Sequence, residues 1–329
     1  MIGCNKTAED EVVYLKNEHI KIGILPNVGG RMVYLNYLED ENLLKADKTQ
    51  WFESDDERIV PSPNSGFKAY NGFITWIGPQ SQWWLDQDVN AELRDLKSTW
   101  PPDPYLIYGH FKITKKTNTS ITLIGPESPV SGVKLTKQYS LKSNELIIKV
   151  TAENIRKKTI SFDIWSNARF DGFTDFIVPA FDEDLLKVEP KDPEFPKNTA
   201  YKIDDGFFYF DKEFPLKGED DKVSKAFLHP QKGNIIAVRN NTFLLMDFDF
   251  VPKAQIHPNQ GFIEVYSLLS DKKEDCLLEL EHHSAYKTLK PGESSTLTET
   301  WSLFEFNVQK DHRDYYGFYK NIINDINEM

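Results

Sequence analysis

Apolar and polar residues alternate with a period of two along much of the chain, as they do in half-buried β-strands. Ile20, Ile22 and Ile24, for example, alternate with Lys21 and Gly23. Most of the alternating runs end at turn-forming residues. The runs span residues 12–15, 20–24, 32–35, 107–114, 120–124, 133–141, 145–153, 159–164, 235–239, 242–248, 261–268, 276–281 and 294–304. Strands of this number and spacing predict an all-β protein with two large antiparallel sheets packed face to face.

Helical periodicity is limited to two segments. Residues 87–96 predict a short helix with Asp86 near its cap, and residues 313–329 predict a terminal helix that packs one apolar face on the body of the protein. Residues 181–221 carry many prolines and charges, so we expect a long surface excursion there. Because strands continue beyond this segment, residues 12–329 are expected to form one domain.

The composition narrows the classes of function. The 329 residues include 39 basic and 51 acidic side chains, a net charge of -12, without a basic stripe, so nucleic acid is not an expected partner. No apolar run reaches the roughly 20 residues of a membrane span. The sequence has no motif for a nucleotide cofactor, a serine nucleophile or calcium, and His282-His283 lacks the spacing of a metal site, so neither cofactor nor metal is expected.

The two cysteines, Cys4 and Cys276, give no disulfide framework. Residues 1–11 look like the end of a bacterial lipoprotein signal, in which a lipidated cysteine is followed by a flexible acidic tether, although the basic and apolar parts of such a signal do not precede Cys4. Two locations therefore stay open. The protein is a periplasmic or surface lipoprotein if Cys4 carries a lipid, and cytoplasmic otherwise.

The segment from Leu25 to Arg31 interrupts an alternating strand with a turn. Pro26 cannot donate to a strand ladder, and Gly29 and Gly30 allow positive φ, so the strand turns here and then resumes. Arg31 follows the two glycines with few neighbours to crowd its guanidinium, which suits a ligand oxygen. A surface arginine after a hairpin gives the same pattern.

Four tryptophans lie within 25 residues, in a proline-rich stretch that cannot be regular: Trp76, Trp83, Trp84 and Trp100. Sugars stack their C–H faces on indoles, and polar neighbours such as Gln80, Gln82 and Asp103 can bind sugar hydroxyls. This combination predicts a carbohydrate pocket. The alternative is that these tryptophans close the open end of the sheets as part of the core.

Glutamates recur on the strands near the C-terminus. The period of two places Glu279 and Glu281 on one face of their strand, and the polar turn at residues 270–275 predicts a hairpin that makes Glu264 a cross-strand neighbour of one of them. Two carboxyl groups this close raise one pKa and can supply an acid and a base. A solvated outer face of a sheet gives the same pattern.

With these residues the chain resembles the galactose-mutarotase-like superfamily, from about Val12 to Phe306. The resemblance implies a large antiparallel β-supersandwich that binds sugars in a cleft. The motifs that carry it are Gly29-Gly30-Arg31 after a strand, Trp76 with Pro79-Gln80, Trp100-Pro101-Pro102-Asp103-Pro104, Glu264-Val265-Tyr266, Leu278-Glu279-Leu280-Glu281, Leu289-Lys290-Pro291-Gly292-Glu293 and Glu299-Thr300-Trp301.

The true mutarotases of this superfamily open the pyranose ring with a histidine as acid and a glutamate as base. In the matching segment, Asn167 stands where that histidine would be, with Arg169 beside it, and asparagine cannot deliver a proton at neutral pH. The resemblance places the base on Glu264, with Glu281 second. An epimerase built on this chain would need another acid, for which His283 and His110 are candidates.

Three functions follow from this reasoning. The first is a protein that binds a sugar or oligosaccharide, the second is a sugar epimerase or mutarotase, and the third is a structural accessory domain whose cleft is closed by its own loops. A histidine within hydrogen-bond reach of a glutamate across the cleft would favour the enzyme, whereas arginine and asparagine alone would favour binding. The expected binding residues are Arg31, Trp76, Gln80, Trp100, Asp103, Asn167 and Arg169, with Glu264 and Glu281 as the expected catalytic residues.

Overall fold

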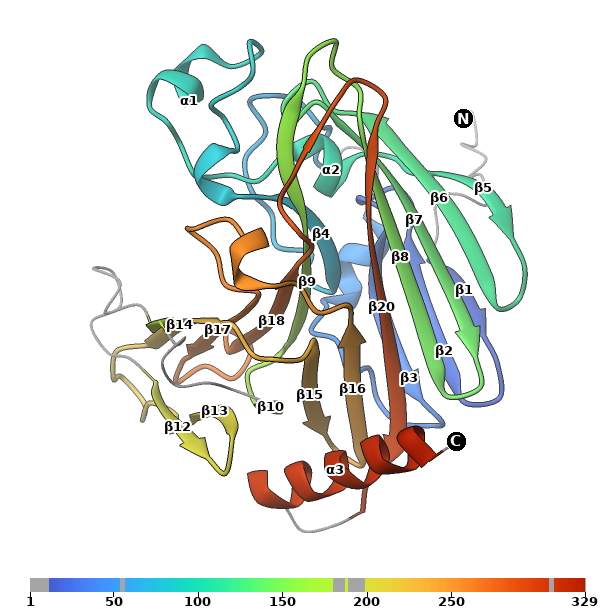
Figure 1. Cartoon of the computed structure of the whole chain (residues 1–329), viewed down its shortest axis with the longest axis vertical. Helices are drawn as coiled ribbons and strands as arrows, with labels where there is room; N and C mark the ends of the chain where they lie inside the picture. The colour runs from blue at the N-terminus through green and yellow to red at the C-terminus, as the bar shows by residue number, and fades with distance from the viewer. Residues whose placement is uncertain (1–11, 54–56, 180–186, 189–198, 308–310, 329) are drawn as a thin grey trace, which may run out of the picture.

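The computed structural model describes residues 12–53, 57–179, 187–188, 199–307 and 311–328. The predicted N-terminal tether with Cys4 lies outside these residues. Within them, the strands form two ten-stranded sheets with antiparallel neighbours, which confirms the predicted fold class (Figure 1). No helix in the described residues is long and apolar enough to cross a membrane.

The first sheet brings together strands that are far apart in the sequence. In particular, β4, β9, β18, β17 and β14 are consecutive neighbours in it. The order of its strands is β1 (Val13–Lys16), β2 (Ile20–Leu25), β3 (Arg31–Tyr37), β4 (Phe73–Gly78), β9 (Ile160–Asp171), β18 (Leu277–His283), β17 (Ile263–Leu269), β14 (Lys222–Leu228) and β11 (Lys187–Val188), and β19 (Lys287–Leu289) pairs with β9 beside this path.

The second sheet packs on the first around a large apolar core. Phe73 of the first sheet meets Trp301 and Tyr139 of the second edge to face, with ring centroids 5.3 and 6.4 Å apart. The order of its strands is β12 (Ala200–Asp204), β13 (Phe207–Asp211), β10 (Asp175–Pro179), β15 (Asn234–Arg239), β16 (Thr242–Phe248), β20 (Ser294–Glu305), β8 (Glu145–Asn154), β7 (Val133–Lys142), β6 (Ser120–Glu127) and β5 (Lys112–Lys116).

The terminal helix packs on the outside of the second sheet, as predicted. Tyr315, Tyr319 and Ile322 of this helix contact outward side chains of β10, β15 and β16, beside which the helix lies in Figure 1. The helices of the described residues are α1 (Ala91–Asp95), α2 (Pro104–Tyr108) and α3 (His312–Glu328), with short 3₁₀ turns η1 (Lys48–Phe52), η2 (Gln80–Gln82) and η4 (Lys253–Gln255).

Two predictions about local structure need correction. The helix expected at residues 87–96 is only the single turn α1, and its cap is Asn90, whose side chain accepts from the backbone N–H of Leu93 at 2.9 Å, while Asp86 pairs with Lys158 instead. The segment 181–221 is not only a surface excursion, because its described part includes β12 and β13. The aromatic run from Phe207 to Phe210 is buried between the core and α3.

Candidate functional site

Three rows of side chains cross the face of the first sheet that lies opposite the apolar core. Because side chains alternate along a strand, residues two positions apart share this face. The paired positions give one row of Phe227, Glu264, Glu281 and Asn167, a second of Lys225, Tyr266, Glu279 and Arg169, and a third of His283, Trp165 and Trp76. Glu264 lies directly opposite Glu281, so the predicted cross-strand glutamate pair is confirmed.

Lys225 lies between the two paired glutamates. Its ammonium is 2.9 Å from Glu264 Oε2 and also donates to Glu281 Oε2. Burial opposes the ionisation of Glu264, but Lys225 and His283 outweigh it and lower the pKa of Glu264 to about 2. The pKa of Glu281 is raised to about 8. Burial is the main cause, the neighbouring carboxylates add to it, and Lys225 opposes it. The two carboxyl groups therefore hold different protonation states at neutral pH.

Arg169 and Asn167 hold the third glutamate of the face. Arg169 Nη2 is 2.7 Å from Glu279 Oε1, and Arg169 Nη1 donates to Asn71 Oδ1 at 3.2 Å. Asn167 Nδ2 donates to Glu279 Oε2 at 3.2 Å and also to Glu281 Oε1. A continuous chain of charged and amide groups thus fixes every carboxylate of this face.

His283 lies on the same face of the sheet, beside these charged and amide groups. This face is the floor of the site. Its Nε2 is 3.2 Å from Glu264 Oε1, and its Nδ1 is 2.8 Å from both Asp163 Oδ1 and Gln260 Nε2. Burial disfavours the imidazolium, but Asp163 and Glu264 outweigh it and raise the pKa of His283 to about 9. Its ring packs on Trp165 at a centroid distance of 4.9 Å. His283 is therefore a buried cation that orients Glu264.

The opposite side of the same strands is fixed by Glu299 of the second sheet. Its carboxylate accepts from Ser166 Oγ at 2.9 Å and Trp301 Nε1 at 2.7 Å, and lies 3.1 Å from His282 Nε2. Ser166 and His282 directly adjoin Asn167 and His283 in sequence. This buried network ties the strands that carry the site to the core behind them.

This face of the sheet forms one side of a cleft of about 990 Å³. Trp100 lies at its rim, 43% exposed, with its ring centroid 4.6 Å from that of Phe67. Gln80 also lines the cleft and donates to the carbonyl of Thr99 at 3.1 Å. Among the described residues, three buried nitrogens of the lining have no hydrogen-bond partner: Nε1 of Trp76, Nε1 of Trp165 and Nε of Arg169.

The cleft gathers most of the residues that were predicted for it. These are Trp76, Gln80, Trp100, Arg169, Glu264 and Glu281. Asn167 is fully buried beneath the glutamates and acts as their support, since it does not line the cleft. His110, a candidate acid, lies at the end of α2 next to Asn27 and is also not part of the lining.

Arg31 does not line the cleft, contrary to the prediction. The turn before it forms as expected, with φ of 72° at Gly29 and 57° at Gly30. However, Arg31 is only 2% exposed, and its fork donates to the carbonyls of Asn71 at 2.8 Å and Ile107 at 3.2 Å. It therefore supports the loop from which Asn71 contacts Arg169.

Asp103 does not line the cleft either, although it was predicted to bind sugar there. Its carboxylate accepts from the backbone N–H of Tyr105 at 3.0 Å, from that of Ser131 at 3.1 Å and from Ser128 Oγ at 2.5 Å, so it caps α2 and fastens a turn. The tryptophans divide between the two predicted roles. Trp76 and Trp100 line the cleft, whereas Trp84 is a fully buried core residue.

Sequence reasoning missed Lys225 and Trp165, which lie near the centre of the site. Lys225 belongs to β14, a strand that was not predicted although Val223, Ala226 and Leu228 are buried. In the sequence, a single lysine on a short strand is only a weak indication of a functional site. Only the pairing of β14 with β17 shows its partners.

Solved structures of other proteins share this fold. Solved structures with the same fold include a galactose mutarotase related enzyme from Lactobacillus acidophilus, with a TM-score of 0.53, 11% identity and coverage of 90% of this chain and 100% of that one. A galactose mutarotase-like protein from Lactobacillus casei matches with a TM-score of 0.51, 14% identity and coverage of 89% and 100%. The GalM/aldose epimerase homologue from C. elegans matches with a TM-score of 0.51, 12% identity and coverage of 90% and 99%. The chain thus has a galactose mutarotase-like fold.

The family is defined more narrowly by sequence. The family model described as "Domain of unknown function (DUF4380)" matches residues 11–304, so the chain belongs to this family. No curated protein matches the chain in sequence.

Proposed function

We propose that the protein binds a carbohydrate in this cleft and does not open its ring. The observation that carries the proposal is the set of buried donors without partners, Nε1 of Trp76, Nε1 of Trp165 and Nε of Arg169, on a wall that also presents Glu264. A buried polar atom without a partner costs about 1 to 3 kcal/mol. Sugar hydroxyls both donate and accept, so a bound sugar would satisfy these groups together with the carboxylate.

The size of the cleft favours more than one sugar ring. A volume of about 990 Å³ lies at the upper end of the range of roughly 300 to 1,000 Å³ for small-molecule sites. Trp100 and Phe67 at the rim offer an aromatic surface on which a ring can stack by its C–H face. We therefore expect an oligosaccharide to bind better than its single unit.

The arrangement of acids argues against the mutarotase route. Asn167, which the resemblance aligns with the histidine of true mutarotases, has no proton to give and lies under Glu279 and Glu281. His283 comes within 3.2 Å of Glu264, but it belongs to the same floor, is 1% exposed and has both ring nitrogens next to protein groups. An enzyme is expected to hold its histidine across the cleft from Glu264, and His283 does not lie there.

A thermal-shift screen against mono- and oligosaccharides tests the proposal, because a ligand of the native state raises the Tm by mass action. Calorimetric titration of the best ligand into Trp100→Ala should show a loss of about 5- to 30-fold, as expected for an aromatic contact of about 1 to 2 kcal/mol. Phe52→Ala, which removes an aromatic that is 59% exposed outside the cleft, is the control. A panel without a single shift, or equal losses in both variants, would contradict sugar binding here.

One observation favours the epimerase as a second function. Glu264 is held ionised while the neighbouring Glu281 has its pKa raised to about 8, and carboxyl groups whose pKa values are pushed apart can act as base and acid. Such an enzyme would show a pH-rate profile that falls above about pH 8, where Glu281 loses its proton. A rate that stays constant through that pH would exclude Glu281 as the acid.

A further inference from the structure

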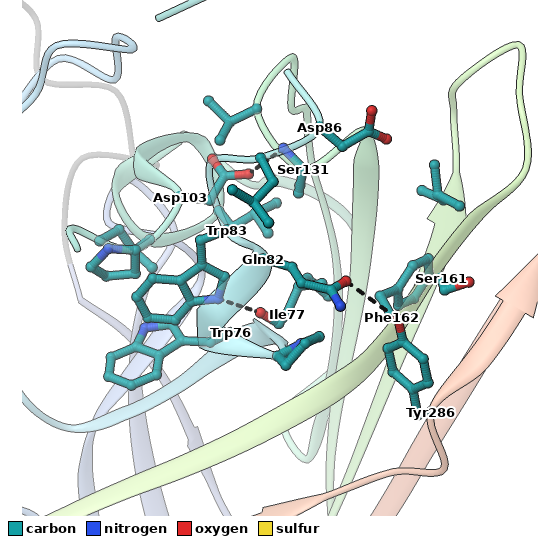
Figure 2. A pocket seen from close by; sticks show the side chains of 18 of the residues that line it. Trp76, Ile77, Gln82, Trp83, Asp86, Asp103, Ser131, Ser161, Phe162 and Tyr286 are labelled. Atoms are coloured by element: carbon teal, nitrogen blue, oxygen red, sulfur yellow. Dashed lines mark hydrogen bonds between the residues drawn. The ribbon is translucent and has the colours of Figure 1, made fainter. Parts of the chain in front are cut away.

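A second cavity lies behind the wall of the cleft, enclosed by the loop after β4, the start of α2 and the first residues of β9. Its volume is about 320 Å³, and Figure 2 shows the side chains that surround it. Trp76 and Pro79 line both cavities, so the cavity and the cleft share a wall. Of the residues on which the proposed sugar site depends, only Trp76 also lines this cavity; Asp103, which was predicted to bind sugar, lines it as well.

Apolar side chains form the inner part of the cavity. Its inner surface includes side chains that are at most 9% exposed: Trp83, Leu106, Ile107, Val130, Ile160 and Phe162. An apolar cavity of about 150 Å³ suffices to bind benzene, so this one has room for a substituted ring. Its shape and lining fit a small aromatic or short alkyl molecule.

Most polar groups around the cavity are already paired. Trp83 Nε1 donates to the carbonyl of Ile77 at 2.6 Å, and the carboxylate of Asp103 accepts from the N–H of Ser131, both drawn in Figure 2. The hydroxyl of Ser131 is different, because it lies buried beside the Asp103 carboxylate, whose ionised form it favours, and among the described residues no group donates to its oxygen. The lining thus offers a ligand hydroxyl one hydrogen-bond acceptor, the oxygen of Ser131.

The mouth of the cavity is bordered by surface contacts. Gln82 accepts from Tyr286 Oη at 3.3 Å, as Figure 2 shows, and Asp86 pairs with Lys158 at 2.5 Å. Asp86 and Lys158 each have side chains 59% exposed, and pairs of this kind contribute little to stability. Thr159 lies exposed at the same rim. A small molecule can therefore enter without disrupting the core.

We propose that this cavity is a second ligand site, which takes an aromatic ring carrying one hydroxyl group, with the ring among the apolar side chains and the hydroxyl on Ser131. Such a ring can arrive as a free phenol or as the aglycone of a glycoside. The proposal stands apart from the proposed function, because a free phenol can bind whether or not the cleft takes a sugar.

Calorimetric titration of p-cresol and toluene into the full chain tests this proposal. Ser131→Ala removes a hydroxyl that lies beside the Asp103 carboxylate, so urea unfolding is measured alongside, and we expect the variant to stay within about 1 kcal/mol of the wild type. It should bind p-cresol about 3- to 10-fold more weakly, the value of one hydrogen bond, and toluene equally well. Absence of p-cresol binding to the wild type, or p-cresol binding that Ser131→Ala leaves unchanged, would overturn the proposal.

A blocking variant locates the ligand independently. Thr159→Trp places a large ring at the mouth and should weaken p-cresol binding at least tenfold, whereas Lys157→Trp, on the same turn but outside the lining, should not. Equal p-cresol affinity in the two variants would overturn the location. A phenyl glycoside that binds better than its free sugar, with a gain lost only in Thr159→Trp, would identify the ring as an aglycone, and no such gain would identify a free phenol.

Discussion

Removing the charge of Lys225 should destabilise the protein by an amount that depends on pH. Its ammonium contacts Glu264 at 2.9 Å and also Glu281, and the lysine side chain is 18% exposed against 3% and 0% for the two glutamates. Taking one partner out of a buried ion pair costs about 3 to 5 kcal/mol, because the remaining charge is left uncompensated. Lys225→Met is the variant that tests this.

The raised pKa of Glu281 sets the pH dependence. At pH 6 this carboxyl group is protonated in the folded protein, so the loss falls mainly on Glu264 and should be about 3 kcal/mol. At pH 9 the folded variant must either bury an ionised Glu281 without its cation or protonate Glu281 at a pH that disfavours protonation. Both cost free energy, so the loss of stability should be larger than at pH 6. Adding Glu281→Gln to Lys225→Met should recover at least about 1 kcal/mol at pH 9.

Urea unfolding at pH 6 and pH 9 measures these differences. Lys222→Met is the matched control on the same strand, because Lys222 pairs with Glu213, whose side chain is 90% exposed, and such pairs contribute about 0 to 1 kcal/mol. A loss in Lys225→Met no larger than in Lys222→Met, or one that does not grow with pH, would refute the charge arrangement described for the site.

Three further predictions address neighbouring residues. The lysine of Arg31→Lys cannot reach both carbonyls that the arginine fork binds, so the variant should lose about 1 to 3 kcal/mol of stability and bind sugar more weakly through Asn71. Calorimetry detects this against Arg94→Lys, a partly exposed arginine, as control. The pKa of His283 is raised to about 9, so its contribution is full below pH 6.5 and lost as pH rises through 9. In urea unfolding, the stability of the wild type should therefore fall by up to about 3 kcal/mol more than that of His283→Gln as pH rises from 6.5 to above 9. The same pH dependence of stability in both proteins would contradict this. Glu264→Gln should weaken sugar binding about 10- to 100-fold, and an unchanged Kd would show that Glu264 does not contact the ligand.

The sequence predicted those features of the site that depend on neighbouring strands. The polar turn between their strands predicted that Glu264 lies opposite Glu279 or Glu281, and the structure shows that the partner is Glu281. The two sheets were predicted from the period of two. Lys225 was missed because β14 reaches the glutamates only through long-range pairing.

Arg31 shows the limit of local reasoning. The double glycine correctly predicted the turn, but the direction of the guanidinium depends on carbonyls 40 and 76 positions away. The buried aromatic run from Phe207 to Phe210 was hidden for a different reason, since charged and proline-rich residues on its N-terminal side dominated the local composition. Asp103, likewise, has a capping role that only its partners Ser128 and Ser131 show.

Polarimetry on the sugar that binds tests most directly whether the cleft holds a carbohydrate without turning it over. The optical rotation of a freshly dissolved aldose is followed with and without wild-type protein, at a concentration that occupies the cleft. We expect a decay no faster than the spontaneous one, because Asn167, which the resemblance aligns with the acid of true mutarotases, has no proton to give and supports Glu279 and Glu281. An accelerated decay in the wild type that disappears in Glu264→Gln would show that the protein is a mutarotase instead.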